Sequence, residues 1–291
     1  MYSAIRSFDN SSVLQNVSLT ELGGDIKRTL QNLNISFENT DWDLYEQRSR
    51  QLAVARRILG ADLAEGEFGQ DFMRGVQTIG SLLENSSFTE ENYNEILAIR
   101  PRRKRAIADF HLRKSGVASQ PWTIDRLMNQ SFKQAQSRFF PGERKFAAMS
   151  EWATATSEFC GLLQLIARRV AQIDSSIQQL AMTCHQVTLL AEPGDTGDGS
   201  PEGIHQDGAD FIVPALVVLR ENTAGGVSRL YQRVDGIFTT LNEETLMPGY
   251  GWLHPDRGTD FWHDVSSIVS ADGTHACLRR SLGFDVNIVR T

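Results

Sequence analysis

The sequence has 291 residues, and its 36 acidic against 29 basic side chains give a formal net charge of −7. A hydrophobic content of 41% with 22% charged residues is typical of a folded soluble protein and excludes an intrinsically disordered chain. No apolar run reaches membrane-spanning length, no apolar signal core opens the sequence, and the net acidity disfavours nucleic acid as a partner. Three cysteines are too few for a disulfide framework or a zinc cluster, so we expect a cytoplasmic protein.

In residues 1–174, the apolar residues recur mostly at helical spacing, and turn signals are few. Gly60 is placed to end one helix, while Ser87 followed by Glu90 is a start signal for another that must end before Pro101. The expected helices cover 42–59, 72–83, a stretch between Ser87 and Pro101, and 143–173 as one helix or two. We expect this portion to support and cap the rest of the molecule.

The texture changes near residue 175, where alternating and β-branched runs replace the helical spacing. Glycine-rich or polar turns separate these runs, which we predict as strands at 180–190, 211–219, 227–234 and 281–289. Several short strands after a helical part favour a β-sandwich or barrel covered by helices. The sequence therefore predicts an α+β fold with a β core at 175–291, and the two portions are expected to form one compact unit.

A run of basic residues from Arg100 to Arg105 has two interpretations. It could be a nucleic-acid patch, but it lacks interleaved aromatic residues and a second basic segment. We therefore expect a solvated helix start.

The triplet His205-Gln206-Asp207 is the first candidate for chemistry. In an extended segment, side chains two residues apart point to the same face, so the imidazole and the carboxylate can bind one metal ion. Two histidines and one carboxylate leave three positions open on an octahedral ion, which is the arrangement of non-haem Fe(II) oxygenases.

A second histidine must come from elsewhere in the fold, and four others compete for this role. His254 and His275 lie in turn-rich segments, and His185 precedes the triplet. His263 stands at the start of a strand with aromatic and β-branched neighbours, far enough along the chain for several strands to return. We predict that His263 completes the metal site.

Arg279 and Ser281 lie on the last predicted strand and share one of its faces. Together they could hold a carboxylate by an ion pair and a hydroxyl hydrogen bond. Arg280 points to the other face, and a register shift of one residue would make it the anchor instead.

These residues carry a family resemblance over roughly residues 178–289. The segments EGIHQDG at 202–208 and FWHDVSSI at 261–268, with Gly225, Gly226 and Arg279, resemble the Fe(II)/2-oxoglutarate dioxygenases of the bacterial L-isoleucine hydroxylase type. The resemblance implies a double-stranded β-helix, or jelly roll, that acts on free amino acids. It further implies Fe(II) held by His205, Asp207 and His263, and 2-oxoglutarate held by Arg279 with Ser281.

The implied reaction is hydroxylation of an unactivated C–H of a free L-amino acid or cyclic imino acid, with O2 consumed and 2-oxoglutarate converted to succinate and CO2. Two alternatives stay open. The same cofactors could drive desaturation or cyclisation, or the jelly roll could be a non-catalytic binding module with a vestigial metal site. The expected partner is a small molecule, and the sequence predicts no oligomeric state.

Overall fold

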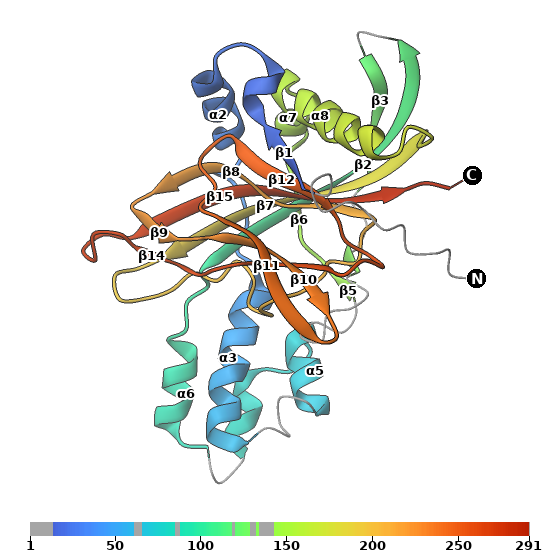
Figure 1. The fold of residues 1–291 in the computed structure, drawn as a ribbon. Coiled ribbons are helices and arrows are strands. Elements are labelled where there is room, and N and C mark those ends of the chain that lie inside the picture. The colour runs from blue at the N-terminus through green and yellow to red at the C-terminus, as the bar shows by residue number, and fades with distance from the viewer. Residues whose placement is uncertain are drawn as a thin grey trace.

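A large antiparallel sheet forms the centre of the molecule (Figure 1). The computed structural model describes residues 14–60, 66–84, 88–117, 120–128, 132–133 and 143–290. The strand order is β1-β12-β8-β15-β7-β2-β3, and the short β6 adds a parallel pair to β2. The bounds are β1 Gln15–Ser18, β2 Arg103–Val117, β3 Gln120–Leu127, β6 Ala147–Ala148, β7 Gln179–Ala191, β8 Phe211–Glu221, β12 Tyr250–Pro255 and β15 Cys277–Ile288.

Smaller sheets face the inner side of this large sheet. One has the order β11-β10-β13, and another pairs β14 with β9. Their bounds are β9 Thr223–Gly225, β10 Ser228–Val234, β11 Ile237–Glu244, β13 Phe261–Val265 and β14 Ile268–Ser270; a separate pair joins β4 Phe132–Lys133 to β5 Glu143–Arg144. The two layers make a jelly roll with helices packed on it, so the predicted α+β jelly-roll fold is confirmed.

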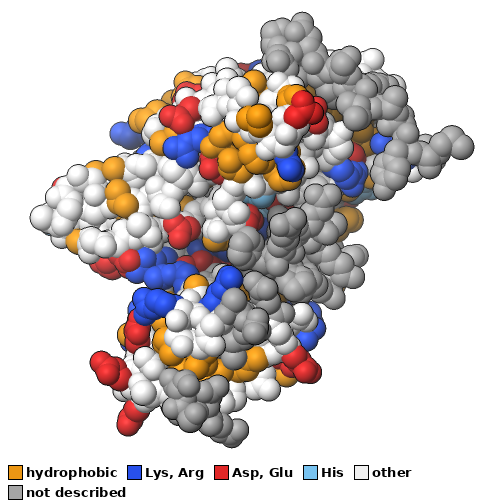
Figure 2. Space-filling view, turned by 60° about the horizontal axis from the view of Figure 1, so that its bottom comes forward, with side chains coloured by type: hydrophobic (Ala, Val, Ile, Leu, Met, Phe, Trp, Pro, Cys, Tyr) orange, Lys and Arg blue, Asp and Glu red, His pale blue; other side chains and the backbone are white. Residues whose placement is uncertain are grey.

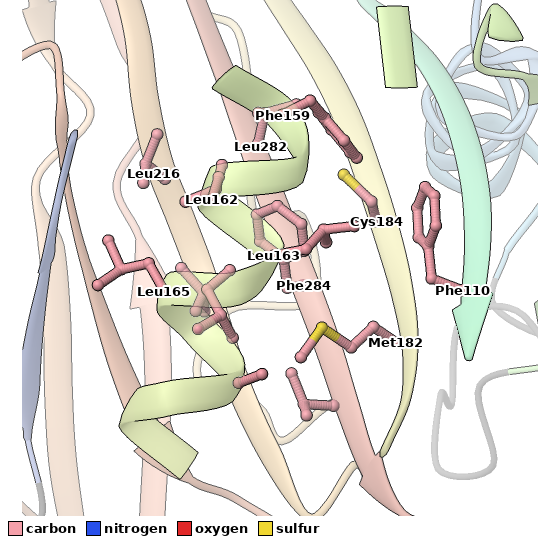
Figure 3. Close-up of a cluster of buried hydrophobic side chains, with 14 of the residues drawn as sticks. Phe110, Phe159, Leu162, Leu163, Leu165, Met182, Cys184, Leu216, Leu282 and Phe284 are labelled. Atoms are coloured by element: carbon pink, nitrogen blue, oxygen red, sulfur yellow. The ribbon is translucent and has the colours of Figure 1, made fainter. Parts of the chain in front are cut away.

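Helices cover the outer face of the large sheet, where α2 (Ile26–Ile35) and α8 (Ser157–Ile173) lie side by side (Figure 1). The apolar face of α8 packs on alternate side chains of β7 and β15, including Met182, Cys184 and Phe284 (Figure 3). Leu162 and Leu163 of α8 are fully buried in this cluster. Because alternate strand residues face opposite sides, the remaining residues of β7 and β15 turn toward the inner layer.

A helical lobe lies on the opposite side of the sheet from α8 (Figure 1). It contains α3 (Leu44–Leu59), α5 (Glu67–Arg74), the 3-10 helix η2 (Ile79–Glu84) and α6 (Glu90–Leu97), with an apolar core of its own. Basic and acidic side chains gather where the lobe meets the body (Figure 2). No helix in the described ranges, which also include η1 (Leu19–Leu22) and α7 (Glu151–Thr154), is long and apolar enough to cross a membrane.

Three local predictions need correction. The run 100–105 is no solvated helix start, because β2 begins at Arg103 and the Arg103 side chain is buried. The predicted helix 143–173 is helical only from α7 onward, since β5 and β6 precede it. The predicted helix 72–83 is broken at Gly75, whose left-handed backbone (φ 77°) ends α5.

The helix starts follow ordinary capping rules. The predicted start signal at Ser87 lies outside the described residues, and α6 begins after Thr89, which accepts a hydrogen bond from the Asn92 amide. The helix predicted at 42–59 corresponds to α3, which begins after Asp43 and ends at Gly60 as expected. Asp43 also accepts a hydrogen bond from Arg103 at 2.8 Å, which ties the start of the lobe to β2.

Candidate metal centre and cosubstrate cavity

The backbone brings His205 and His263 side by side. His205 lies between β7 and β8, and it forms an antiparallel bridge with His263 of β13 through two amide-to-carbonyl hydrogen bonds of 3.0 Å. The two imidazole rings lie 4.3 Å apart between their centroids. This bridge joins the predicted triplet to the predicted distal histidine.

Asp207 completes the group. Its two carboxylate oxygens lie 3.7 Å from His205 Nε2 and 3.4 Å from His263 Nε2, and one ligand atom from each residue falls within 4.8 Å of the others. Adjacent ligands at about 2.1 Å from one octahedral ion are roughly 3 Å apart, so these separations suit a shared metal ion. His205 Nδ1 lies 2.8 Å from the Gly203 carbonyl, and donation there leaves Nε2 as the ligand atom.

The pKa values in this group follow from burial and from mutual charge. Burial opposes ionisation of Asp207, but the hydrogen bond from His263 and the charges of both histidines outweigh it and lower its pKa. Burial, reinforced by His205, lowers the pKa of His263. Burial also disfavours the charged form of His205, yet Asp207 and Glu202 outweigh it and raise its pKa. An ionised carboxylate and a neutral imidazole are the protonation states that bind a divalent metal.

Gln206, between His205 and Asp207, points away from the candidate metal group. Its Nε2 donates to the carbonyl oxygens of Asp256, Thr259 and Phe261, at 3.0, 3.0 and 2.7 Å. It therefore fastens the triplet to the turn that leads into β13. No role for Gln206 was expected from the sequence, although the alternation that pairs His205 with Asp207 also turns Gln206 to the opposite side.

Arg279 and Ser281 face the same cavity as the metal group, from β15. The Arg279 side chain is only 2% exposed, and its Nη1 lies 3.4 Å from Ser281 Oγ. Among the described residues, its Nε and Nη2 have no hydrogen-bond partner. Burial and the charge of Arg220 lower the pKa of Arg279 to about 10. A buried guanidinium with free donors is well suited to bind a carboxylate that enters the cavity.

Arg280 points to the other face of β15. Its Nη1 donates to the Oδ1 of Asn34 at 2.8 Å, and its guanidinium stacks over Phe37 at 5.7 Å. The register therefore has Arg279 in the cavity and Arg280 among the helices. Gly226 lies close to the Arg279 side chain with φ 64°, and a Cβ there would come within 3.1 Å of Arg279 Cδ. Glycine at this position leaves room for the arginine.

Comparison with known proteins agrees with this geometry. The model of the 2OG-Fe dioxygenase family matches residues 86–285. The chain belongs to this family. Fe(II), 2-oxoglutarate and O2 are therefore its cofactors and cosubstrates, as predicted, and the donor set of two imidazoles and one carboxylate fits ferrous iron.

Solved structures share the fold of this dioxygenase at low sequence identity. A bsmA homologue from Methylobium petroleophilum PM1 is 15% identical, with 96% of this chain and 89% of that chain covered and a TM-score of 0.64. IDO from Bacillus thuringiensis is 11% identical over the whole of both chains, with a TM-score of 0.60. The Fe(II)/α-ketoglutarate-dependent dioxygenase TqaL is 14% identical over 97% of this chain and 84% of that chain, with a TM-score of 0.57. No curated protein matches the sequence.

The other histidines of the dioxygenase lie outside the metal group. His254 is buried, and its ring centroid lies 5.6 Å from that of His263; burial and the charge of His263 lower its pKa to about 3. Its Nδ1 lies 2.9 Å from the Pro255 carbonyl. His275 is in an exposed turn against Asp272. His185 lines the cavity without joining the metal group.

Three arginines from the first half of the dioxygenase also line the cavity: Arg103 and Arg105 of β2, and Arg144 of β5. None of the three was expected from the sequence: Arg103 and Arg105 belong to a basic run that looked like a solvated surface, and Arg144 was not singled out. The apolar residues that directly follow the basic run, from Ala106 to Phe110, were a strand signal that could have located Arg103 and Arg105.

Proposed function

We propose that this protein hydroxylates an unactivated C–H of a free L-amino acid or cyclic imino acid, with conversion of 2-oxoglutarate to succinate and CO2. The single observation that carries the proposal is the cavity that holds the His205, Asp207 and His263 group together with Arg279. The resemblance of the triplet segment to the L-isoleucine hydroxylase type supports the choice of a free amino acid.

In this proposal His205, Asp207 and His263 hold the metal, and Arg279 with Ser281 binds the distal carboxylate of 2-oxoglutarate. Bound Fe(II) supplies O2 activation coupled to oxidative decarboxylation of the cosubstrate. The protein orients these groups and excludes water from the cavity, where Arg279 and His263 are almost fully buried. Asp207 stays ionised because its pKa is lowered, which keeps the ligand set ready for the metal.

A screen of free amino acids tests the proposal. Purified protein with Fe(II), 2-oxoglutarate and O2 should form succinate with at least one L-amino acid or cyclic imino acid, and the product should gain one oxygen atom by mass spectrometry. A product that instead loses two hydrogens would favour desaturation or cyclisation. Absence of succinate with every candidate, in a protein that binds Fe(II) and 2-oxoglutarate, would contradict the proposal and favour a different substrate class. Failure to bind either cofactor would favour the non-catalytic module.

A further inference from the structure

The cavity contains a second polar group beside the metal site. His185 of β7 lies between Arg105 of β2 and Asp285 of β15, and all three line the cavity. Arg105 Nη2 lies 2.9 Å from His185 Nδ1, and His185 Nε2 lies 3.1 Å from Asp285 Oδ2. Because arginine can only donate, Nδ1 must accept and the hydrogen on Nε2 is donated to the carboxylate. Three adjacent strands thus place a cation, an imidazole and an anion in a row.

Aromatic packing positions the cationic end of this row. The Arg105 guanidinium stacks over the Phe146 ring at 4.4 Å, and that of Arg144 lies 5.5 Å from the same ring. Phe146 in turn packs edge-on against Tyr45 at 5.5 Å. Burial, together with the like charges of Arg105 and Arg103, lowers the pKa of Arg144 to about 10. An anion that binds at this end would relieve the repulsion among the arginines.

The charges of the cavity balance. Among the described residues, four arginines line it against Glu202, Asp207 and Asp285, and Asp43 supplies a fourth carboxylate through its ion pair with Arg103 at 2.8 Å. Fe(II) and the dianion of 2-oxoglutarate add equal and opposite charges. The loaded cavity is therefore close to neutral overall, with a cationic end at Arg105 and an anionic end at Asp285. A net-neutral molecule with separated charges complements it best.

We propose that Arg105 binds the carboxylate and Asp285 binds the ammonium group of a free α-amino acid, while His185 is a positioning residue that sets their separation. The inference rests on the proposed function, since it names the groups that recognise the substrate of that same site. The α-carboxylate and ammonium belong to one carbon, so an amino acid that spans His185 can reach both partners. A peptide-linked residue would lack one or both of these charges.

The test measures binding, so it does not depend on turnover. The 291-residue protein, loaded with Fe(II) and 2-oxoglutarate under argon, is screened by calorimetry against the proteinogenic L-amino acids and L-pipecolic acid. The tightest ligand is then compared with its carboxamide, which lacks the carboxylate charge, and with its deaminated acid, which lacks the ammonium group. In the wild-type protein, the dissociation constant of the amino acid should be about 50-fold lower than that of each analogue. A loss of this size is expected when one partner of a buried charge pair is removed.

The variants assign each charge to its residue. Arg105→Met should lose the preference over the carboxamide and keep the preference over the deaminated acid, and Asp285→Asn should do the reverse. Damage to the cavity in general would weaken all three ligands equally. Lys104→Met and Asp109→Asn are matched controls on β2; Lys104 stacks over Trp42 at 4.9 Å and Asp109 accepts a hydrogen bond from Thr183, and neither is among the residues that line the cavity. Both controls should keep both preferences.

The inference is overturned if no amino acid binds, or if Arg105→Met and Asp285→Asn keep both preferences. Altered preferences in the expected pattern, with no succinate formed from 2-oxoglutarate in the presence of the bound amino acid and O2, would support this recognition site and contradict the proposed reaction.

Discussion

Arg279 carries a full positive charge on a side chain that water barely reaches. In the cavity, hydrogen bonds from Nε and Nη2 can go to an incoming carboxylate. We expect Arg279→Met to raise the dissociation constant of 2-oxoglutarate by about 100-fold, because a buried charge pair would be lost. Anaerobic titration of the Fe(II)-loaded protein with 2-oxoglutarate, followed by the charge-transfer absorption of the complex, measures this change.

Arg280→Met is the control for this prediction, since Arg280 lies on the same strand and contacts Asn34 on the opposite face. It should lower stability and leave 2-oxoglutarate affinity unchanged. If Arg280→Met weakened 2-oxoglutarate binding while Arg279→Met did not, the assignment of the anchor would be wrong.

We expect His205 to set the pH dependence of metal binding. Its pKa is raised, so in the metal-free protein it keeps its proton to a higher pH than an ordinary histidine, whereas the lowered pKa of His263 keeps that ring neutral. A bound metal ion must displace the proton from His205. The metal affinity should therefore be highest and independent of pH above the pKa of His205, and it should fall about tenfold per pH unit below that pKa. Calorimetric titration with Mn(II) from about pH 5.5 to 8 measures the profile.

Glu202 lies 3.7 Å from His205 Nε2 and helps to raise its pKa. Glu202→Gln should therefore shift the whole Mn(II) profile to lower pH. A profile that moved to higher pH, or stayed in place, would show that Glu202 does not hold the proton on His205.

At the scale of elements, the Gln206 side chain adds to the backbone bridge between His205 and His263 in attaching the triplet segment. Gln206 donates to the carbonyls of Asp256 and Thr259 in the turn between β12 and β13 and to that of Phe261 at the start of β13. These bonds join the triplet segment to the strand of His263. Gln206→Glu would direct a carboxylate at three carbonyl oxygens, and we expect it to weaken Mn(II) binding by about 10- to 100-fold, the range for residues that orient metal ligands. Calorimetry measures the binding, and circular dichroism checks that the fold is intact. Wild-type affinity in Gln206→Glu would contradict this role.

Strands rich in apolar and β-branched residues could be predicted from the sequence, and a strand that begins with a run of charges could not. The predicted strands 180–190, 211–219, 227–234 and 281–289 correspond to β7, β8, β10 and β15, because apolar and β-branched residues mark each stretch. The sequence at the start of β2 resembles an exposed surface segment, because its arginines face a polar cavity. Pairing of β2 with β7 spans a long stretch of chain, and no local pattern reports such a contact. For the same reason Arg105 and Asp285 could not be brought together from the sequence.

The candidate metal site was easier to predict, because the spacing of His205 and Asp207 is itself the signal. The choice of His263 as the distal histidine required a comparison of the sequence around each candidate histidine. The bridge between His205 and His263 agrees with that choice. Their roles as metal ligands, and those of Arg279 and Ser281, stay predictions.

At the scale of the whole molecule, α8 supports the cavity from behind. Leu163 is fully buried against the outer face of the strands whose inner face carries the cavity residues (Figure 3). Leu163→Ala should lower the free energy of unfolding by about 2–5 kcal/mol through the lost contacts and the space left behind. Urea denaturation measures this loss. Because the helix touches the opposite face, the affinity for 2-oxoglutarate of the folded variant should match the wild type; a large change would show that the two faces are coupled.

The order of strands in the large sheet has a consequence for how the chain folds during synthesis. β15 follows every other strand of that sheet in the sequence, yet it lies between β7 and β8 and pairs with both. Until β15 leaves the ribosome, β7 and β8 each present an edge with unpaired backbone groups. The pairings of β15 with these two strands, which are distant in sequence, cannot form before then. We expect nascent chains that stop before Cys277 to self-associate and to need a chaperone, because the strand that brings Arg279 and Asp285 is also the one that closes the sheet.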